Sequence, residues 1–451
     1  MDLLKSLFKG DKVIWVVFMT LCLISIIEVF SAASTLTYKS GDHWAPIAQH
    51  SLYLLLGAGV VVIVHNIPCK LLRLIPVLTL PAGIILLLVA MLFGERVNGA
   101  GRWLPIFGIQ FQPSEIAKMA VITSTALILS MMQGESNAQP KAFRYILGIV
   151  GVNCLLIAPE NFSTAGMLFM VTLLLMYIGR VSMKQLGKLL GVITVAAGIA
   201  VAALFATPEK VLNETPGLHR AITWKNRLTE FFVSKDVSPQ DYDIDKNAQK
   251  AHASIAIATS HVVGKMPGNS VERDFLSQAF SDFIFAIIIE ELGLLGGGFV
   301  VFLYIILLIR AGRIAGQCDK KYLSLLVMGI ALLLVAQAML NMMVAVGLFP
   351  VTGQPLPLIS KGGTSTLINC VYIGIILSVS CYVEQMKKNQ IAIPVTESEE
   401  NEGLSAENES EEIIEIVNKE NISEAWTTSE LSLAEEVLAD TSSPQYPSQT
   451  H

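Results

Sequence analysis

The chain has 451 residues, of which 53% are hydrophobic and 15% are charged, and its formal net charge is −6. Soluble domains carry roughly 25% charged residues, so this composition excludes an ordinary soluble protein and indicates an integral membrane protein. The six cysteines lie mostly in or beside apolar segments without CxxC spacing, so we expect neither a disulfide framework nor a metal site. No nucleic-acid partner is expected. The N-terminal segment MDLLKSLFKGDK shows no small-residue cleavage site, so we expect a retained anchor.

The apolar residues are gathered into ten runs of about 20 residues. A helix of about 20 residues rises about 30 Å and can cross the hydrocarbon core of a bilayer. We therefore predict an all-α integral membrane protein with about ten transmembrane helices. The predicted spans lie near residues 13–33, 49–65, 73–93, 114–132, 144–159, 163–179, 186–206, 280–309, 322–347 and 364–385.

Lysine and arginine are divided unevenly between the two sets of loops that these spans create. One set, which includes the N-terminal segment, contains 16 of them, and the opposite short loops contain only Lys39, Arg96, Arg102 and Lys361. Positively charged residues in short loops stay on the cytoplasmic side. This asymmetry predicts that both termini are cytoplasmic and that the long loop of residues 207–279 is extracytoplasmic.

The composition changes after Lys388. Residues 389–451 contain 15 acidic residues and one lysine, which leaves a positive balance on the rest of the chain. Low hydrophobicity together with charge of one sign is typical of disorder. We predict a polytopic membrane domain of residues 1–388 and an acidic, disordered cytoplasmic tail of residues 389–451, with a docking segment around Glu411 to Val417 as the alternative.

Four groups of polar residues that are costly at membrane depth lie on or near the extracytoplasmic side, and the fourth is the short ENFSTA turn at residues 160–165. The first, residues 98–118, is rich in glycine and proline and predicts a re-entrant or surface-hugging loop. Pro113 and Ser114 are expected to open the next helix, with Ser114 at the N-cap or first position. Glu115 and Lys118 then share one helix face. They are either an internal ion pair or charges at a polar ligand, where Arg102 and Lys118 could reach a phosphate.

The second motif is SDFIFAIIIEELG, residues 281–293, where the long loop enters the eighth span. Asp282 is either a helix cap or a carboxylate whose desolvation would suit it as a general base near neutral pH. Glu290 and Glu291 lie deeper, and we expect them to have internal partners.

The third motif, residues 347–366, is too rich in glycine and proline for a regular helix. Non-helical backbone at membrane depth is tolerated where it lines a cavity or is buried in protein. Gly362 and Gly363 before Thr364 could offer backbone N–H groups to an anion, with Lys361 adjacent. A simple helix corner is the alternative. The loop of residues 207–279, with its apolar helical segment near residues 251–264, is long enough to act as an ordered lid on the membrane.

Five motifs occur in one order on the ten spans: NGAGRW, FQPSEIAK, the loop from Gln249 to Gly264, SDFIFAIIIEELGLLG and NMMVAVGLFPVTGQPLPLISKGG. Over about residues 10–388 the chain closely resembles the shape, elongation, division and sporulation (SEDS) family, the FtsW/RodA/SpoVE group of bacterial cell-wall glycosyltransferases, and most of all its division type. Four features depart from the usual pattern of the family: Gly101, Lys361, the Leu276–Ser277 dipeptide and the ENFSTA turn at residues 160–165.

The resemblance implies a peptidoglycan polymerase that joins lipid II disaccharides into glycan strands on the outer face of the membrane and releases undecaprenyl pyrophosphate. It identifies Asp282 as the essential carboxylate and places working charges at Glu115 and Lys118. The remaining positions expected to bind substrate are Arg102, Gln249, Lys361, Gly362, Gly363 and Thr364. No cofactor is required by the sequence, although a divalent cation could assist the departing diphosphate.

The resemblance also implies partners and a location. These are lipid II, a cognate class B penicillin-binding protein, other divisome membrane proteins and membrane lipids, in the bacterial cytoplasmic (inner) membrane, with the division septum as a candidate site. Three alternatives stay open: a lipid-linked precursor flippase or transporter, a rod-elongation paralogue of the same polymerase, and a scaffold that positions a transpeptidase. Against transport, the polar motifs gather on one side, and the two halves show no repeated pair of interrupted helices.

Overall fold

The computed structural model describes residues 9–32, 45–97, 100–106, 109–134, 138–207, 248–276 and 280–391, together with positions 222, 225, 226 and 229. The chain divides into two compact units, Met1–Lys388 and Asn389–His451. The acidic tail from residue 392 onward lies outside the described residues, so its predicted disorder and its cytoplasmic position stay predictions.

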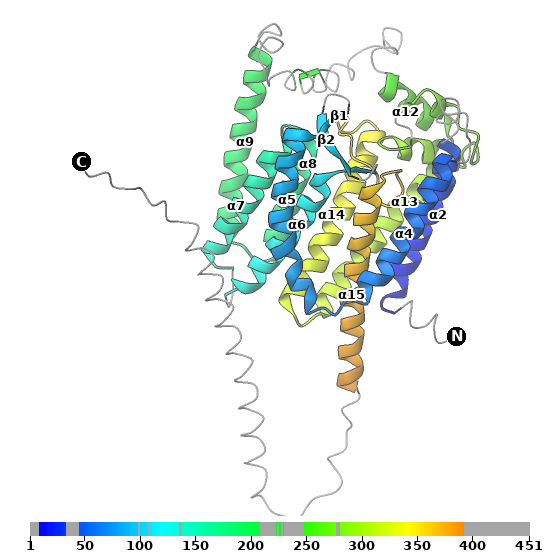
Figure 1. The fold of residues 1–451 in the computed structure, drawn as a ribbon. Coiled ribbons are helices and arrows are strands. Elements are labelled where there is room, and N and C mark those ends of the chain that lie inside the picture. Colours follow the sequence, from blue (N-terminus) through cyan, green and yellow to red (C-terminus); the bar gives the residue numbers. More distant parts are fainter. Residues whose placement is uncertain are drawn as a thin grey trace, which may run out of the picture. The chain divides into compact units, whose positions relative to one another are not determined.

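Long apolar helices build the first unit (Figure 1). Nine helices in the described ranges are long and apolar enough to cross a membrane, and α8, with 17 residues, is slightly shorter. All ten predicted spans are therefore present as helices, and the fold class is confirmed. The bounds are α2 (Lys12–Ala32), α4 (Ala45–His65), α5 (Leu74–Phe93), α6 (Pro113–Met131), α7 (Pro140–Ile157), α8 (Phe162–Ile178), α9 (Met183–Ala206), α13 (Ile284–Gln317), α14 (Lys321–Ala345) and α15 (Thr364–Ile391).

Local sequence signals explain where several of these helices begin. The Asp11 Oδ1 accepts hydrogen bonds from the backbone N–H groups of Val13 and Ile14, which caps α2. Asn161 caps α8 by accepting from the Thr164 N–H at 3.1 Å. Pro113 and Ser114 open α6 as predicted, but Pro113 occupies the first position and Gln112 is the N-cap, so the assignment of Ser114 to the N-cap or first position was wrong.

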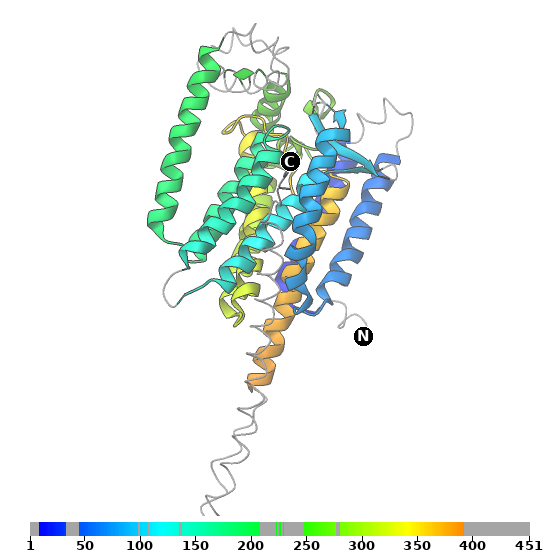
Figure 2. The same cartoon turned by 60° about the vertical axis from the view of Figure 1, so that its left-hand side comes forward.

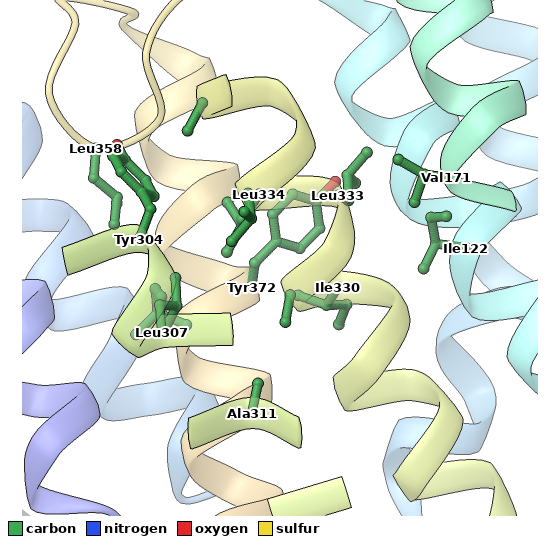
Figure 3. Packing of buried hydrophobic residues seen from close by; sticks show 14 of the residues in the cluster. Ile122, Val171, Tyr304, Leu307, Ala311, Ile330, Leu333, Leu334, Leu358 and Tyr372 are labelled. Atoms are coloured by element: carbon green, nitrogen blue, oxygen red, sulfur yellow. The ribbon is translucent and has the colours of Figure 1, made fainter. Parts of the chain in front are cut away.

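The core lies where α6, α13, α14 and α15 meet. Figure 3 shows Tyr304 of α13, Leu334 of α14 and Tyr372 of α15 packed in one apolar layer, with Ile122 and Val171 at its far edge. In contrast, α9 lies at the edge of the bundle in Figure 1, stands apart from the other helices in Figure 2, and has one buried residue, Leu186. Its apolar surface therefore faces outward, which is expected of a helix surrounded by lipid.

A small antiparallel sheet, which sequence reasoning did not predict, lies between α5 and α6. It consists of β1 (Glu95–Val97), β2 (Ala100–Ile106) and β3 (Ile109–Phe111) in the order β1-β2-β3. Leu104 pairs with Phe111 and Pro105 with Gln110. The glycine-rich stretch was predicted as a re-entrant or surface-hugging loop, but its strands satisfy their backbone groups by pairing with one another.

Helix α13 is broken at Gly293, whose φ of 74° is not helical. The segment after α12 (Ala248–Thr259) fills the break, because the Leu294 N–H donates to His261 O and the Leu295 N–H donates to Val262 O, each at 3.3 Å. The contact is between backbones, and a Cβ on Gly293 would lie 2.2 Å from Val262 O. Only glycine fits this position.

The long loop between α9 and α13 contains the helix that the sequence predicted. Helix α12 packs against α13, and Ala251, Ala253 and Ala256 are buried. A short 3-10 helix, Glu272–Asp274, follows it. The apolar face of α12 therefore packs against protein, which differs from the prediction that this segment lies on the membrane.

Candidate functional site

Glu115 and Lys118 lie one turn apart near the start of α6, and both are buried. The Lys118 Nζ is 2.9 Å from Glu115 Oε1 and donates a hydrogen bond of 2.8 Å to Gln337 Oε1 on α14. The Gln337 Nε2 in turn donates to Pro355 O at 3.1 Å. This geometry is that of the internal ion pair, one of the two interpretations of the motif, and a phosphate contact at Lys118 stays a prediction.

Asp282 occupies a different environment, at the head of α13, and is partly exposed. The N-cap of α13 is Phe283, so Asp282 precedes the cap and does not occupy it. The Ser281 hydroxyl donates to Asp282 Oδ1 at 3.1 Å. The Asn341 Nδ2 donates both to the Asp282 carbonyl, at 2.9 Å, and to the Gln354 carbonyl, at 2.7 Å. The backbone at Asp282 is therefore held in place from α14.

Helix α14 connects these two places. Gln337 and Asn341 are one turn apart on it; Gln337 contacts Lys118 and Pro355, and Asn341 contacts Asp282 and Gln354. The Glu115–Lys118 pair and Asp282 are therefore linked through two side chains of α14, Gln337 and Asn341, and through the loop that contains residues 354 and 355.

The non-helical segment of residues 346–363 packs against the residues that precede α13. The Ser360 hydroxyl donates to Ser281 O at 2.7 Å, and the Lys361 N–H donates to Phe280 O at 3.0 Å. The same Ser360 hydroxyl accepts from the Leu356 N–H at 2.7 Å, which closes a tight turn. Leu358 within this turn has a φ of 66°, a conformation that a leucine keeps only when its surroundings enforce it.

The four predicted anion-binding residues stand where this segment enters α15. Gly363 has a φ of 51°, and Thr364 begins the helix, where unpaired backbone N–H groups favour negative charge. The Thr364 hydroxyl donates to Gln110 O on β3 at 3.1 Å, which ties this corner to the small sheet. Within the described ranges Lys361 has no carboxylate at ion-pair distance, and partial burial lowers the pKa of its ammonium below the usual lysine value.

Gln249 and Arg102 are placed less fully. Gln249 is partly buried in the first turn of α12, a helix that packs against α13. Arg102 lies in β2, and its side chain is outside the described residues. In the part of the chain that the structure describes, no group of three or more histidine, cysteine or acidic side chains could hold a metal ion.

Residues 11–385 match the family model FTSW_RODA_SPOVE, described as a cell cycle protein. The chain belongs to this family. The match spans all ten helices apart from the end of α15.

Relatives in the FtsW/RodA/SpoVE family cover most of the chain. A probable peptidoglycan glycosyltransferase FtsW of Coxiella burnetii is 29% identical over 390 residues, which is 84% of this chain and 99% of the relative. A protein of the same description from Alcanivorax borkumensis is 31% identical over 376 residues, covering 81% of this chain and 92% of the relative. The family assignment therefore rests on relatives that are matched over almost their entire length.

Solved structures of low sequence identity share the fold. A chain from a peptidoglycan synthase complex, described as coordinating polymerization and crosslinking, has a TM-score of 0.65 at 20% identity and covers 84% of this chain and 99% of its own. The rod shape determining protein RodA of Thermus thermophilus has a TM-score of 0.58 at 19% identity and covers 83% and 97%. These likenesses concern the fold alone.

Four residues that connect the site of this FtsW/RodA/SpoVE family member were not predicted from the sequence. Gln337, Asn341, Gln354 and Ser360 are all buried and hydrogen-bonded. A signal was available for two of them, because Gln337 and Asn341 are polar residues spaced i,i+4 inside an apolar run. Gln354 lies in a loop, where a polar residue needs no explanation. Its amide donates to Thr164 in the ENFSTA turn, which brings that turn to the same network.

A second group of buried charges joins α2, α13 and the segment after α12. Glu290 contacts Lys265 Nζ at 2.7 Å, and Glu291 accepts from Ser31 and lies 3.7 Å from Arg273 Nη1. The expected internal partners of both glutamates are therefore present. Glu28 faces Glu291, is fully buried, and has no hydrogen-bond partner on either carboxyl oxygen among the described residues.

Proposed function

We propose that this chain is a peptidoglycan glycosyltransferase that polymerises lipid II on the outer face of the bacterial cytoplasmic membrane during cell division. The observation that supports it best is the partly exposed carboxylate of Asp282, whose backbone is held by Asn341 in the family's SDFIF segment. A mobile backbone would not keep a base within hydrogen-bond reach of a sugar hydroxyl.

In this proposal Asp282 accepts the proton of the 4-hydroxyl of the acceptor sugar. The hydroxyl oxygen bonds to the anomeric carbon of the donor sugar as the bond from that carbon to the diphosphate oxygen breaks. The electron pair leaves with undecaprenyl pyrophosphate. Because negative charge accumulates on this leaving group, stabilising it is the larger electrostatic requirement.

Lys361 and the start of α15 are suited to that requirement. Lys361 carries a half-buried cation without a carboxylate partner among the residues described, and Gly362, Gly363 and Thr364 open a 28-residue helix. An anion at a helix start gains from several N–H groups at once. Lys118 is less accessible, since its ammonium already contacts Glu115 and Gln337. A divalent cation at the diphosphate remains part of the proposal and rests on chemistry alone.

The proposal extends to partners and place. A cognate class B penicillin-binding protein would crosslink the strands that this chain makes, and other divisome membrane proteins would bring both to the septum. Support comes from the fold shared with a chain of a peptidoglycan synthase complex and from relatives described as FtsW. Both termini would be cytoplasmic, as the distribution of lysine and arginine predicts.

Polymerisation of purified lipid II by the purified chain, with its transpeptidase partner present, tests the activity. Glycan strands should form with the wild-type chain and not with Asp282→Asn. No product from the wild-type chain with a competent partner would contradict the proposal and favour transport, which a lipid II translocation assay in vesicles would then detect.

Cysteine labelling tests the orientation. A cysteine at Ser238 should react with a membrane-impermeant reagent in intact cells, and a cysteine at Ser410 should react only after permeabilisation. The control is the labelling of the parent chain without the introduced cysteine. Labelling of both positions from one side would contradict the proposed topology.

A further inference from the structure

Two buried residues on α2 and α4 are linked to the turn next to Asp282, one directly and one through the other. Ser25 lies on α2 and His50 on α4, and both are almost completely buried. The Ser25 hydroxyl donates a hydrogen bond of 2.6 Å to Ile359 O, and the His50 Nε2 is 2.7 Å from the same hydroxyl oxygen. Neither residue lies in any of the sequence motifs described above.

The direction of these hydrogen bonds follows from the number of protons. A carbonyl oxygen can only accept, so the single Ser25 hydroxyl proton points at Ile359 O. The Nε2 of His50 must therefore carry a proton and donate it to the Ser25 oxygen. The chain of hydrogen bonds then runs from His50 through Ser25 to Ile359, and each donor fixes the next.

The turn that receives this chain is strained and lies against the catalytic segment. It contains Leu358 in the left-handed region, and its neighbour Ser360 donates to Ser281 O at 2.7 Å. Tyr304 of α13 donates to Pro357 O, so the turn is held from both sides. A strained turn persists because its surroundings enforce it. Loss of one support should let it relax and shift Ser281 and Asp282.

His50 also lies within electrostatic range of Lys361, and its Nδ1 is buried without a partner among the residues described. Among the described residues, the hydrogen bond of the His50 side chain is the one directed at Ser25, which agrees with a role exerted through that residue.

We propose that Ser25 and His50 are a positioning pair, which holds the Leu356 to Ser360 turn and through it sets the backbone of Ser281 and Asp282 for glycosyl transfer. The inference rests on the proposed function for its catalytic consequence, but the structural consequence can be measured without substrate. The pair acts through the turn and does not touch the reacting atoms.

The test uses the full chain with its partner and four single variants. His50→Met removes the donor, Ser25→Ala removes the relay, and His50→Gln keeps an amide N–H that can reach the Ser25 oxygen. His65→Met is the matched control, because His65 is a buried histidine at the other end of α4 whose Nδ1 contacts Val62 O of its own helix.

We expect the lipid II polymerisation rate to fall about tenfold in His50→Met and in Ser25→Ala, the size of one lost hydrogen bond of about 1.4 kcal/mol. The double variant should fall no further, because the two residues act in series. His50→Gln should stay within about threefold of wild type, and His65→Met should equal wild type. In an Asp282→Asn background His50→Met should add no loss.

Hydrogen–deuterium exchange supplies the readout that does not depend on activity. The amides of residues 356–361 should lose protection in His50→Met and Ser25→Ala, and keep it in His50→Gln and His65→Met. Unchanged exchange and rate in His50→Met would overturn the inference, and so would equal losses in His50→Met and His65→Met, or a double variant that multiplies the single effects. If the wild-type chain makes no glycan, the proposed function fails, and the exchange result alone decides whether the pair holds the turn.

Discussion

The Glu115–Lys118 pair and Asp282 are contacted from neighbouring turns of α14, yet they differ in what surrounds their charges. The pair is buried, with one carboxylate against one ammonium and an amide beside them. Asp282 is partly exposed, its carboxylate accepts from Ser281, and its carbonyl is held by Asn341. The difference separates two uses of a charge near a membrane: a balanced buried pair holds helices together, whereas a partly exposed carboxylate on a fixed backbone can meet a substrate.

The largest effect is expected from Asp282→Asn, which removes the proton acceptor and keeps the shape. The polymerisation rate should fall by roughly 10²-fold or more, the usual contribution of a positioned base. The melting temperature should change little, because the carbonyl contact with Asn341 is kept. Asp282→Glu should retain part of the activity.

A matched control for this prediction is Asp274→Asn, which changes an exposed carboxylate on the same loop. It should polymerise at the wild-type rate. A wild-type rate for Asp282→Asn would mean that the base lies elsewhere and that Asp282 resembles Glu115 in having a structural role.

Lys118→Met tests the structural role of the buried Glu115–Lys118 pair. It leaves Glu115 buried without its cation, and breaking one partner of a buried pair costs about 3–5 kcal/mol. The double variant Glu115→Gln, Lys118→Met should recover most of this stability, as measured by thermal unfolding in detergent. Full activity in the double variant would assign the pair a structural role alone. Weak donor use by a stable Lys118→Gln variant would place Lys118 at the diphosphate.

Lys361 should make the binding of lipid II depend on pH. Burial lowers the pKa of its ammonium, so the charge is lost at a lower pH than in an ordinary lysine. If the charged form binds the diphosphate, the KM for lipid II should rise as the pH increases through the lowered pKa, at a lower pH than for an ordinary lysine. Lys361→Arg keeps its charge beyond pH 12 or so and should move this rise upward. Identical pH profiles for both chains would remove Lys361 from the binding site.

The smallest effect is expected from Glu28→Gln, which tests the group of buried charges that joins α2, α13 and the segment after α12. Among the described residues, the carboxyl groups of Glu28, Glu290 and Glu291 outnumber the cations of Lys265 and Arg273, and Glu28 has no hydrogen-bond partner. A buried carboxyl without a partner favours the neutral form, and glutamine has the shape of that form. The free energy of unfolding should change by no more than about 0.5 kcal/mol. Glu291→Gln, which weakens contacts with Ser31 and Arg273, should cost more, and a large effect of Glu28→Gln would indicate a charged Glu28.

The sequence predicted the helices well because the length of an apolar run has a direct physical meaning in a bilayer. It also identified Asp282 and the pair at Glu115 and Lys118, because charged residues are rare near such runs. These predictions depend on one residue or one run at a time, and that is why they could be made without knowing the tertiary arrangement.

What the sequence could not provide depends on contacts between distant segments. The choice between an ion pair and a phosphate contact at Lys118 turns on Gln337, more than 200 residues away. The strands at residues 95–111 lack the alternating pattern of a half-buried strand and were taken for a loop. Ser25 and His50 look like ordinary residues of apolar helices until Ile359 is placed beside them.

The break at Gly293 also bears on membrane thickness. On the C-terminal side of the break, residues 294–317 form roughly 36 Å of helix at about 1.5 Å per residue. This length is enough to cross a hydrocarbon core of about 30 Å without the upper part of α13, residues 284–292. The upper part can then remain at the level of the lipid headgroups, where water and the Lys265 ammonium reduce the cost of Glu290. A thicker bilayer would draw this part into hydrocarbon, so the protein should lose stability as acyl chains are lengthened, and α13 should be the helix that limits the range of membranes it tolerates.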